Sequence, residues 1–417
     1  MKLLRFAPFV MALALVAGAC GPGAATTSPS VSAAAPSSGG SSASAAAPSG
    51  SAAAISGTLT IWHSYDSSGG NAEFTAFSKI VDNLKAANPG LQVNLLAVPF
   101  GDLFKKYETE QASGGGPDMI IAPNDSLGVE ARGGFIADIG DKIGDVLGAS
   151  NDVSKSGSTV DGKIYEVPES LKAVAMYYDT AKVPNPPKTT QELLDFVKGG
   201  GKAGIIAGEY FGWGFYSAFG GKVFDDTGKC AASAGGVADA IQYVKDLKAA
   251  GALVDFDYNK VNDAFKNKTI DVMLNGNWVL GDYKTARPTL GVAPVPAGPA
   301  GPAKTMTGVD GWYINSASPN AEVALAAAKF LVSAESQKVY VDTAGHVPAN
   351  TSVAISDPLV KAFSDAIAAG DPRPQTPEMA NYWGAFNNAW KEVLDKGTDA
   401  KTAVATACKT MDTANKK

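Results

Sequence analysis

From residue 56 onward, the chain shows two alternating patterns of apolar side chains. Polar and apolar residues alternate over 58–62, which predicts a strand. Apolar residues then recur every three or four positions, which predicts a helix that ends at Asn88-Pro89-Gly90. Strands that alternate with helices indicate an α/β fold with mostly parallel sheets. The same patterns predict further strands over 91–98, 118–121, 163–167, 173–178 and 270–274.

Helix start and stop signals recur in the second half of the chain. Thr189 and Glu192 have the spacing of a capping box, which predicts a helix start. Gly251 follows a stretch of helical periodicity and is predicted to end that helix. Ser318 and Pro319 stand before another apolar stretch and are predicted to cap its helix.

The N-terminus has the pattern of an export signal. Two basic residues precede an apolar run that ends in small residues directly before Cys20, so residues 1–19 are predicted to be a signal peptide. Cys20 resembles the acylated cysteine of a bacterial lipobox; the alternative is an ordinary signal peptide with a chance cysteine nearby. Residues 20–55 consist almost entirely of Ala, Ser, Gly, Pro and Thr, which predicts a disordered linker. We therefore expect an extracytoplasmic protein that is anchored to the bacterial cell membrane through lipidated Cys20.

Composition narrows the function classes. The part after the linker is long enough for two domains with a substantial core. A net charge of −6 argues against nucleic acid or an anionic membrane surface as the main ligand. Cys230 and Cys408 are the cysteines that remain after Cys20. Outside the cell they could form a disulfide or stay as two free thiols, and only the fold decides.

Common enzyme signatures are missing from the sequence. The two histidines, His63 and His346, do not have metal-ligand spacing and are interpreted as surface or hydrogen-bonded structural residues. The chain contains no GxSxG, P-loop or CxxC motif. We therefore expect a protein that is not an enzyme and uses no metal or cofactor. The 41 acidic residues leave a carboxylate pair for glycoside hydrolysis open.

Aromatic and short polar residues follow several predicted strands. Ligands of α/β folds bind beyond the carboxyl ends of parallel strands, which is where these residues are expected. Sugars present apolar faces and rings of hydroxyls, which aromatic rings and carboxylates or amides recognise. The candidate ligand-binding residues from this pattern are Trp62, Tyr65, Asp66, Asn124, Asp125, Tyr210 and Trp278.

Several short segments carry a resemblance through their common order: Gly57–Trp62, Gly116–Asp125, Gly133–Asp138, Asp161–Tyr165, Pro184–Thr189, Ala264–Phe265, Leu274–Trp278, Asn315–Asn320 and Met379–Trp383. In this order they resemble the maltose-binding protein family of extracellular solute-binding proteins, the receptors of ABC sugar importers. The resemblance implies a two-lobed, periplasmic-binding-protein-like fold in which each lobe is a mostly parallel sheet flanked by helices, with a ligand cleft between the lobes. We expect an N-terminal lobe of 56–168 plus 291–341 and a C-terminal lobe of 169–290 plus 342–417.

The resemblance also assigns roles to single residues. It implies that Asp66 and Asp125 bind sugar hydroxyls from the N-terminal lobe and that Tyr210, Trp278 and Trp383 stack on sugar rings. Glu209 lies near a family carboxylate, within one residue. Several positions depart from the family pattern, so the identity of the sugar stays open. These positions are Ser67 and Ser126 in place of a basic residue, Ala122 in place of an aromatic, Lys172 in place of an acid and Asn387 in place of an arginine.

The resulting hypothesis is a monomeric receptor that captures maltose, a maltooligosaccharide or a related oligosaccharide by hinge closure and delivers it to ABC permease subunits. Three alternatives remain. A secreted glycoside hydrolase or lyase would also bind oligosaccharides. The same receptor fold could take another ligand, including a phosphorylated sugar that pairs with Lys172. Adjacent Tyr177 and Tyr178 are compatible with ferric iron, which tyrosine pairs bind in related receptors.

Overall fold

The computed structural model describes residues 54–65 and 71–417. The predicted signal peptide, Cys20, nearly all of the predicted linker, Asp66 and Ser67 lie outside the described residues. Within the described ranges, we find no helix that is both long enough and apolar enough to cross a membrane.

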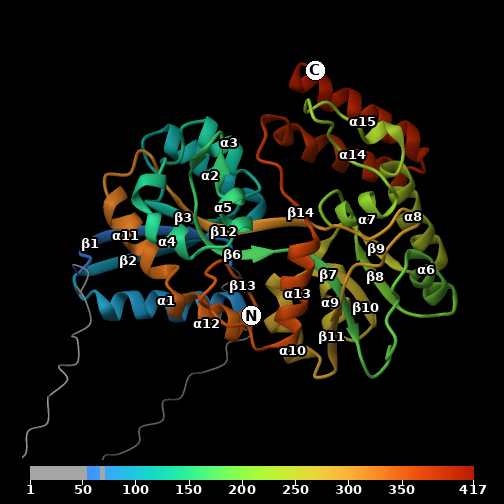
Figure 1. Ribbon diagram of the computed structural model, residues 1–417, viewed down its shortest axis with the longest axis horizontal. Coiled ribbons are helices and arrows are strands. Elements are labelled where there is room, and N and C mark those ends of the chain that lie inside the picture. The colour runs from blue at the N-terminus through green and yellow to red at the C-terminus, as the bar shows by residue number, and fades with distance from the viewer. Residues whose placement is uncertain (1–53, 66–70) are drawn as a thin grey trace, which may run out of the picture. The chain divides into compact units, whose positions relative to one another are not determined.

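The first sheet has the strand order β13-β6-β12-β3-β1-β2, and β14 pairs with β12 (Figure 1). Strand β1 runs parallel to both β2 and β3, whereas β12 runs antiparallel to β3 and β6. The strands are β1 (Gly57–His63), β2 (Leu91–Ala97), β3 (Met119–Pro123), β6 (Val167–Lys172), β12 (Met306–Ile314), β13 (Val347–Pro348) and β14 (Asp371–Pro372).

Alternating side chains of the first sheet form cores on both of its faces, as a period of two requires. Leu59 and Ile61 belong to one apolar cluster together with residues of α1, α11 and α12. Trp62 and Ile120 belong to a second cluster with residues of α2 and α3. Figure 1 shows α1 and α12 along one side of this sheet and α2 and α3 along the other. The helices and turns of this part are α1 (Ala72–Ala87), α2 (Phe100–Ala112), α3 (Leu127–Arg132), η1 (Gly140–Lys142), α4 (Gly144–Ala149), α5 (Asp152–Gly157), α11 (Ala321–Leu331) and α12 (Ala334–Ala344), and a small hairpin joins β4 (Thr159–Val160) to β5 (Lys163–Ile164).

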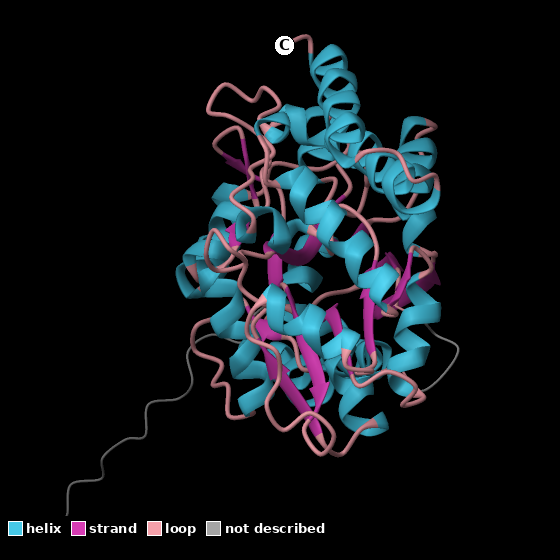
Figure 2. Ribbon diagram, turned by 90° about the vertical axis from the view of Figure 1, so that its right-hand side faces the viewer, coloured by secondary structure: helices cyan, strands magenta, loops and turns pink. Residues whose placement is uncertain are grey.

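The second sheet has the order β11-β7-β10-β8-β9 and is also covered by helices (Figure 2). Its strands are β7 (Val174–Asp179), β8 (Ala203–Ile206), β9 (Leu253–Asp255), β10 (Val272–Gly276) and β11 (Leu290–Ala293). The helices and turns that follow its strands or pack near it are α6 (Thr190–Lys198), α7 (Trp213–Ala218), η2 (Ala232–Ala234), α8 (Val237–Ala250), α9 (Tyr258–Lys266), η3 (Asn277–Val279), α10 (Leu280–Ala286), α13 (Pro358–Ala369), η4 (Pro377–Asn381), α14 (Tyr382–Asp395) and α15 (Ala400–Asn415).

The expectation of mostly parallel sheets is wrong. In the first sheet β12 is antiparallel to β3 and β6, although it is parallel to the short β14, and in the second sheet β7 is antiparallel to β10 and β11. The reason is that β6, β7, β11 and β12 carry the chain between the two sheets. Strand β6 ends in the first sheet at Lys172, and β7 begins in the second at Val174. Strand β11 of the second sheet ends at Ala293, and β12 of the first begins at Met306. The lobe boundaries proposed from the sequence stay predictions, because membership of a sheet does not delimit a lobe.

Most of the predicted helix signals are found in the structure. The Thr189 side chain accepts a hydrogen bond from the Glu192 backbone N–H at the start of α6, and Gly251 ends α8 with a left-handed backbone. The cap predicted at Ser318 and Pro319 is wrong, because the N-cap of α11 is Asn320. The Ser318 hydroxyl instead donates to Asp118, 2.5 Å away, where it links the start of α11 to the first sheet.

A disulfide joins Cys230 to Cys408. The sequence left open whether these cysteines are bonded or free, and in the structure they are bonded. The two Cα atoms are 5.3 Å apart although the residues are 178 positions apart in sequence. Asp412 of the same C-terminal helix accepts a hydrogen bond of 2.8 Å from the Cys230 backbone N–H. The bond and this contact tie α15 to the loop before η2.

Candidate functional site

Asp125 follows β3 at the carboxyl end of a strand, as expected, and forms an ion pair with Arg373. The Arg373 side chain is almost fully buried, whereas a quarter of the Asp125 side chain is exposed. Arg373 also donates from Nη1 to Oδ1 of Asn124 at 2.7 Å. A guanidinium held by two neighbouring oxygen acceptors is oriented rigidly. Arg373 therefore places a fixed positive charge beside Asp125, which is predicted to bind sugar hydroxyls.

Arg373 also links Asp125 to two predicted aromatic residues. Its guanidinium carbon lies 5.4 Å from the ring centroid of Tyr210 and 6.0 Å from that of Trp383. Both rings are half-buried. Cations at this distance from an aromatic face are attracted to it. One arginine side chain thus brings together three residues that the sequence predicted to bind ligand.

Trp278 completes the aromatic group from η3, directly after β10. Its ring centroid is 6.0 Å from that of Tyr210. The indole Nε1–H donates to the Tyr258 hydroxyl at 3.0 Å, which sets the ring plane. Trp278 is half-buried. We refer to Asp125, Tyr210, Trp278, Arg373 and Trp383 as the aromatic site.

Glu209 lies next to Tyr210 and is held from helix α14. The Asn387 side-chain amide donates to its carboxylate at 3.0 Å, and the Tyr382 hydroxyl donates to its backbone carbonyl at 3.0 Å. Burial raises the pKa of Glu209 above its ordinary value. Asn387 stands where the family pattern has an arginine, so Glu209 has a neutral partner at that position.

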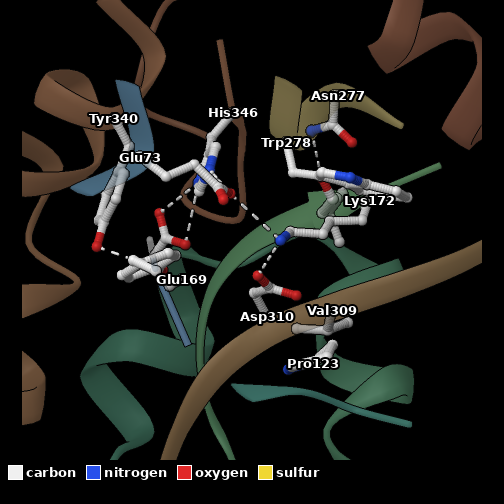
Figure 3. A network of polar contacts seen from close by, with 12 residues as sticks. Glu73, Pro123, Glu169, Lys172, Asn277, Trp278, Val309, Asp310, Tyr340 and His346 are labelled. Atoms are coloured by element: carbon white, nitrogen blue, oxygen red, sulfur yellow. Dashed lines mark hydrogen bonds and ion pairs between the residues drawn. The ribbon is translucent and has the colours of Figure 1, made fainter. Parts of the chain in front are cut away.

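Lys172 is the last residue of β6, and its ammonium group lies over Trp278 at 5.5 Å from the ring centroid. It also forms ion pairs with Asp310 at 2.5 Å and with Glu73 at 3.4 Å (Figure 3). Burial opposes the charge on Lys172, but these carboxylates outweigh it and raise its pKa. Lys172 is therefore charged, and two protein carboxylates already neutralise it.

The structure places three other predicted ligand residues in buried positions. Trp62 is 5% exposed in the core beneath α2, with Lys106 over its ring at 4.7 Å. Tyr65 is 8% exposed and packs against Phe77. The Asn124 side-chain N–H donates to the Gly157 carbonyl, and its oxygen accepts from the Val309 backbone N–H and from Arg373. A ligand role for these three stays a prediction, and Asp66 lies outside the described residues.

The fold separates the side chains of Tyr177 and Tyr178, the pair on which the ferric iron alternative depends. Tyr177 is fully buried, and its hydroxyl donates to the Gly276 carbonyl at 2.8 Å. Tyr178, the next residue of β7, points to the other face of the strand, where it packs against a different apolar cluster. Across the described part of the chain, we find no cluster of three or more His, Cys, Asp or Glu side chains that could hold a metal ion.

Sequence reasoning missed Arg373, although a signal was present. The chain has only four arginines, and this one stands between two prolines in Asp371-Pro372-Arg373-Pro374. Proline restricts the backbone on both sides, so such an arginine projects from a stiff segment. Its partner Asp125 is 248 residues away, which no local pattern reveals.

Comparison with known proteins identifies the family. Residues 79–370 match the family described as bacterial extracellular solute-binding protein. The chain belongs to this family. A solute-binding lipoprotein of a maltooligosaccharide ABC transporter from Streptococcus pneumoniae is 27% identical over 333 residues, 72% of this chain and 76% of the relative. A galactooligosaccharide-binding protein from Bacillus subtilis is 25% identical over 382 residues, 84% of this chain and 88% of the relative.

A solved structure of another solute-binding protein confirms the predicted fold class. The maltotriose-binding protein of Thermus thermophilus, bound with maltotriose, superimposes with a TM-score of 0.79 at 28% identity. The match covers 86% of this chain and 100% of the other. The chain is therefore an α/β solute-binding protein with helix-flanked sheets, and the three similar proteins named here are binding proteins for oligosaccharides.

Proposed function

We propose that this solute-binding protein is the extracytoplasmic receptor of an ABC importer for maltose, maltooligosaccharides or a related oligosaccharide. Residues 1–19 would direct export, and acylated Cys20 would anchor the protein to the bacterial cell membrane. The receptor would act as a monomer and deliver its sugar to permease subunits without altering it.

The observation that carries the proposal is the composition of the aromatic site. Tyr210, Trp278 and Trp383 are half-buried residues from three separate segments, and the ion pair of Arg373 and Asp125 lies beside Tyr210 and Trp383. Aromatic faces bury the apolar face of a pyranose, while a carboxylate and a guanidinium bind hydroxyls on its rim. This combination suits a neutral carbohydrate.

The relatives support a sugar of more than one unit. One is a maltooligosaccharide receptor, another binds galactooligosaccharides, and a third was solved with maltotriose. Three aromatic rings offer more stacking surface than a single monosaccharide covers. We therefore propose an oligosaccharide ligand, with an α-linked glucose oligomer as the leading choice.

Capture by hinge closure follows from where the polar and aromatic groups originate. Asp125 follows a strand of the first sheet, whereas Trp278 follows a strand of the second. A ligand that contacts both gains its full set of interactions only when the two parts are close together, so it shifts the population toward a closed form. A dissociation constant of about 1 μM, or about −8 kcal/mol, would allow both capture and release.

Calorimetric titration tests the proposal. We expect the purified protein to bind maltotriose or maltotetraose more tightly than glucose or a phosphorylated glucose, with a galactooligosaccharide as the alternative ligand class. Trp278→Ala and Trp383→Ala are each expected to weaken binding about tenfold or more, because each removes about 1.4 kcal/mol or more of stacking. Phe100→Ala is the matched control, since Phe100 is an exposed aromatic at the start of α2.

The same samples separate the receptor from the enzyme alternative. After incubation with the oligosaccharides, a receptor leaves the number of reducing ends unchanged. New reducing ends would support a hydrolase, and new unsaturated products a lyase. Failure to bind any of these sugars would overturn the proposed function.

A further inference from the structure

A group of charged side chains lies next to the aromatic site and has no assigned role. It consists of Glu73 from α1, Glu169 and Lys172 from β6, Asp310 from β12 and His346 from the loop before β13 (Figure 3). We call these five residues the buried charge cluster. Their side chains are 13% exposed or less. The cluster includes His346, which was interpreted from the sequence as a surface or hydrogen-bonded structural residue.

Both ring nitrogens of His346 face carboxylates. Nε2 is 2.8 Å from Oε1 of Glu73, and Nδ1 is 3.3 Å from Oε2 of Glu169. A neutral imidazole carries one N–H donor, so it can bond only one carboxylate, whereas an imidazolium bonds both. The ring stacks on Tyr340 with centroids 4.7 Å apart and planes 3° apart.

The charge on His346 reaches Lys172 through Glu73. The same Glu73 oxygen that faces His346 lies 3.4 Å from the Lys172 ammonium, so this carboxylate bridges two cations. Lys172 is held on its other side by Asp310 and lies over Trp278 of the aromatic site. In Figure 3, the Glu73 carboxylate lies between His346 and the Lys172 ammonium, and the Lys172 side chain runs beside Trp278.

Electrostatics favours the charged form of His346. Burial alone would lower its pKa, but Glu169 and Glu73 outweigh it and raise the pKa to about 9. With His346 charged, the cluster sets two cations against three carboxyl groups. With His346 neutral, Lys172 would be the remaining cation of the cluster. The titratable groups that face the ring are Glu73 of α1, Glu169 of β6 and Tyr340 of α12, and Tyr65 contacts the Tyr340 hydroxyl at 3.5 Å.

We propose that His346, as an imidazolium, is a positioning residue for sugar binding: it holds Glu73 in place, and Glu73 holds the Lys172 ammonium against the indole of Trp278. This inference rests on the proposed function, because it concerns the same site. His346 itself is fully buried and acts through its neighbours.

The first test reads the charge of His346 directly by NMR of the imidazole nitrogens. The chain has only two histidines, and the other is an internal control, because burial lowers the pKa of His63 to about 4. At pH 7.5 we expect one imidazolium and one neutral ring. Assignment uses the His346→Gln variant, which loses the imidazolium signal. Two neutral rings at this pH would overturn the inference.

The second test measures the affinity for maltotriose as a function of pH. Since the protonated form is the competent one, wild-type affinity should be constant from pH 6 to 8 and fall about tenfold as the pH rises through 9. His346→Gln should bind about tenfold more weakly at pH 7 and lose the step near pH 9. Phe100→Ala should keep the wild-type profile. An unchanged affinity in His346→Gln would contradict the proposal.

A double-mutant cycle with Lys172→Met separates positioning from a general loss of structure. If His346 acts through Lys172, the double variant should bind no worse than Lys172→Met alone, and Lys172→Met should also lose the step near pH 9. Additive losses would overturn the inference. The Lys172→Met profile decides the question even where His346→Gln does not fold. Wild-type protein that binds no sugar overturns the proposed function and this inference together, whereas normal sugar binding without the step near pH 9 overturns this inference alone.

Discussion

At the scale of single residues, Arg373 links Asp125 to the rings of Tyr210 and Trp383. Tyr210, Trp278 and Trp383 were predicted to bind sugar; the structure places Tyr210 and Trp383 beside one guanidinium, and Trp278 beside Tyr210. That guanidinium belongs to Arg373, which no local pattern connects to Asp125. Pairings of charged groups far apart in sequence depend on the completed fold, so they are found only in the structure.

A buried carboxyl group outside the site makes stability depend on pH. Glu130 of α3 is fully buried, and burial together with nearby Glu108 raises its pKa to about 9. In the unfolded chain this group ionises near pH 4.5. Between these two values the folded protein keeps a proton that the unfolded chain releases, so the free energy of unfolding falls as the pH rises, by up to about 1.4 kcal/mol per unit.

Glu130→Gln is therefore expected to be stabilised relative to wild type more strongly at pH 8 than at pH 5. Urea unfolding at both pH values measures the difference. Glu335→Gln, on the exposed start of α12, should leave the wild-type pH dependence unchanged. If the free energy of unfolding changed equally between pH 5 and pH 8 in Glu130→Gln and wild type, the prediction would be contradicted.

At the scale of elements, the positions of helices and strands were largely predictable and the directions of the strands were not. The predicted strand over 58–62 and the helix that follows it correspond to β1 and α1. Alternation of side chains shows that a segment is a strand, but it is the same for both strand directions. The antiparallel pairing of β12 with β3 and β6 arises because the chain returns from the second sheet.

The junction between β10 and η3 gives a sharp prediction for the aromatic site. A Cβ atom on Gly276 would lie 1.8 Å from Cζ3 of Trp278, so the indole packs directly on this glycine. Gly276→Ala should displace the ring and weaken sugar binding about tenfold or more. Calorimetry measures the affinity, and far-ultraviolet circular dichroism checks the fold.

Gly101→Ala in α2 is the matched control for this glycine. A Cβ atom there meets nothing within 4 Å, and alanine is the better helix former. It should bind sugar normally and be as stable as wild type or slightly more so. Normal affinity in Gly276→Ala would mean that the position of Trp278 does not govern binding.

At the scale of the whole molecule, the disulfide between Cys230 and Cys408 is a separate contribution to stability. It joins residues that are 178 positions apart in sequence. Removing a native disulfide typically lowers the free energy of unfolding by about 2–5 kcal/mol. We expect the Cys230→Ser/Cys408→Ser double variant to unfold at a lower urea concentration. Its affinity for sugar should equal that of wild type, because neither cysteine belongs to the aromatic site. An unchanged unfolding midpoint would contradict the prediction.

The place of β12 in the first sheet has a consequence for biosynthesis. Among the strands that the structure describes, β12 alone links β3-β1-β2 to β6-β13, and it begins at Met306, after the last strand of the second sheet has ended at Ala293. A nascent chain that emerges N-terminus first therefore completes the second sheet earlier. Until β12 arrives, β3 and β6 each have a free edge, which is where non-native strand pairing and aggregation begin. The first sheet, whose strands β1, β2, β3 and β6 are synthesised before the second sheet, is thus completed after it.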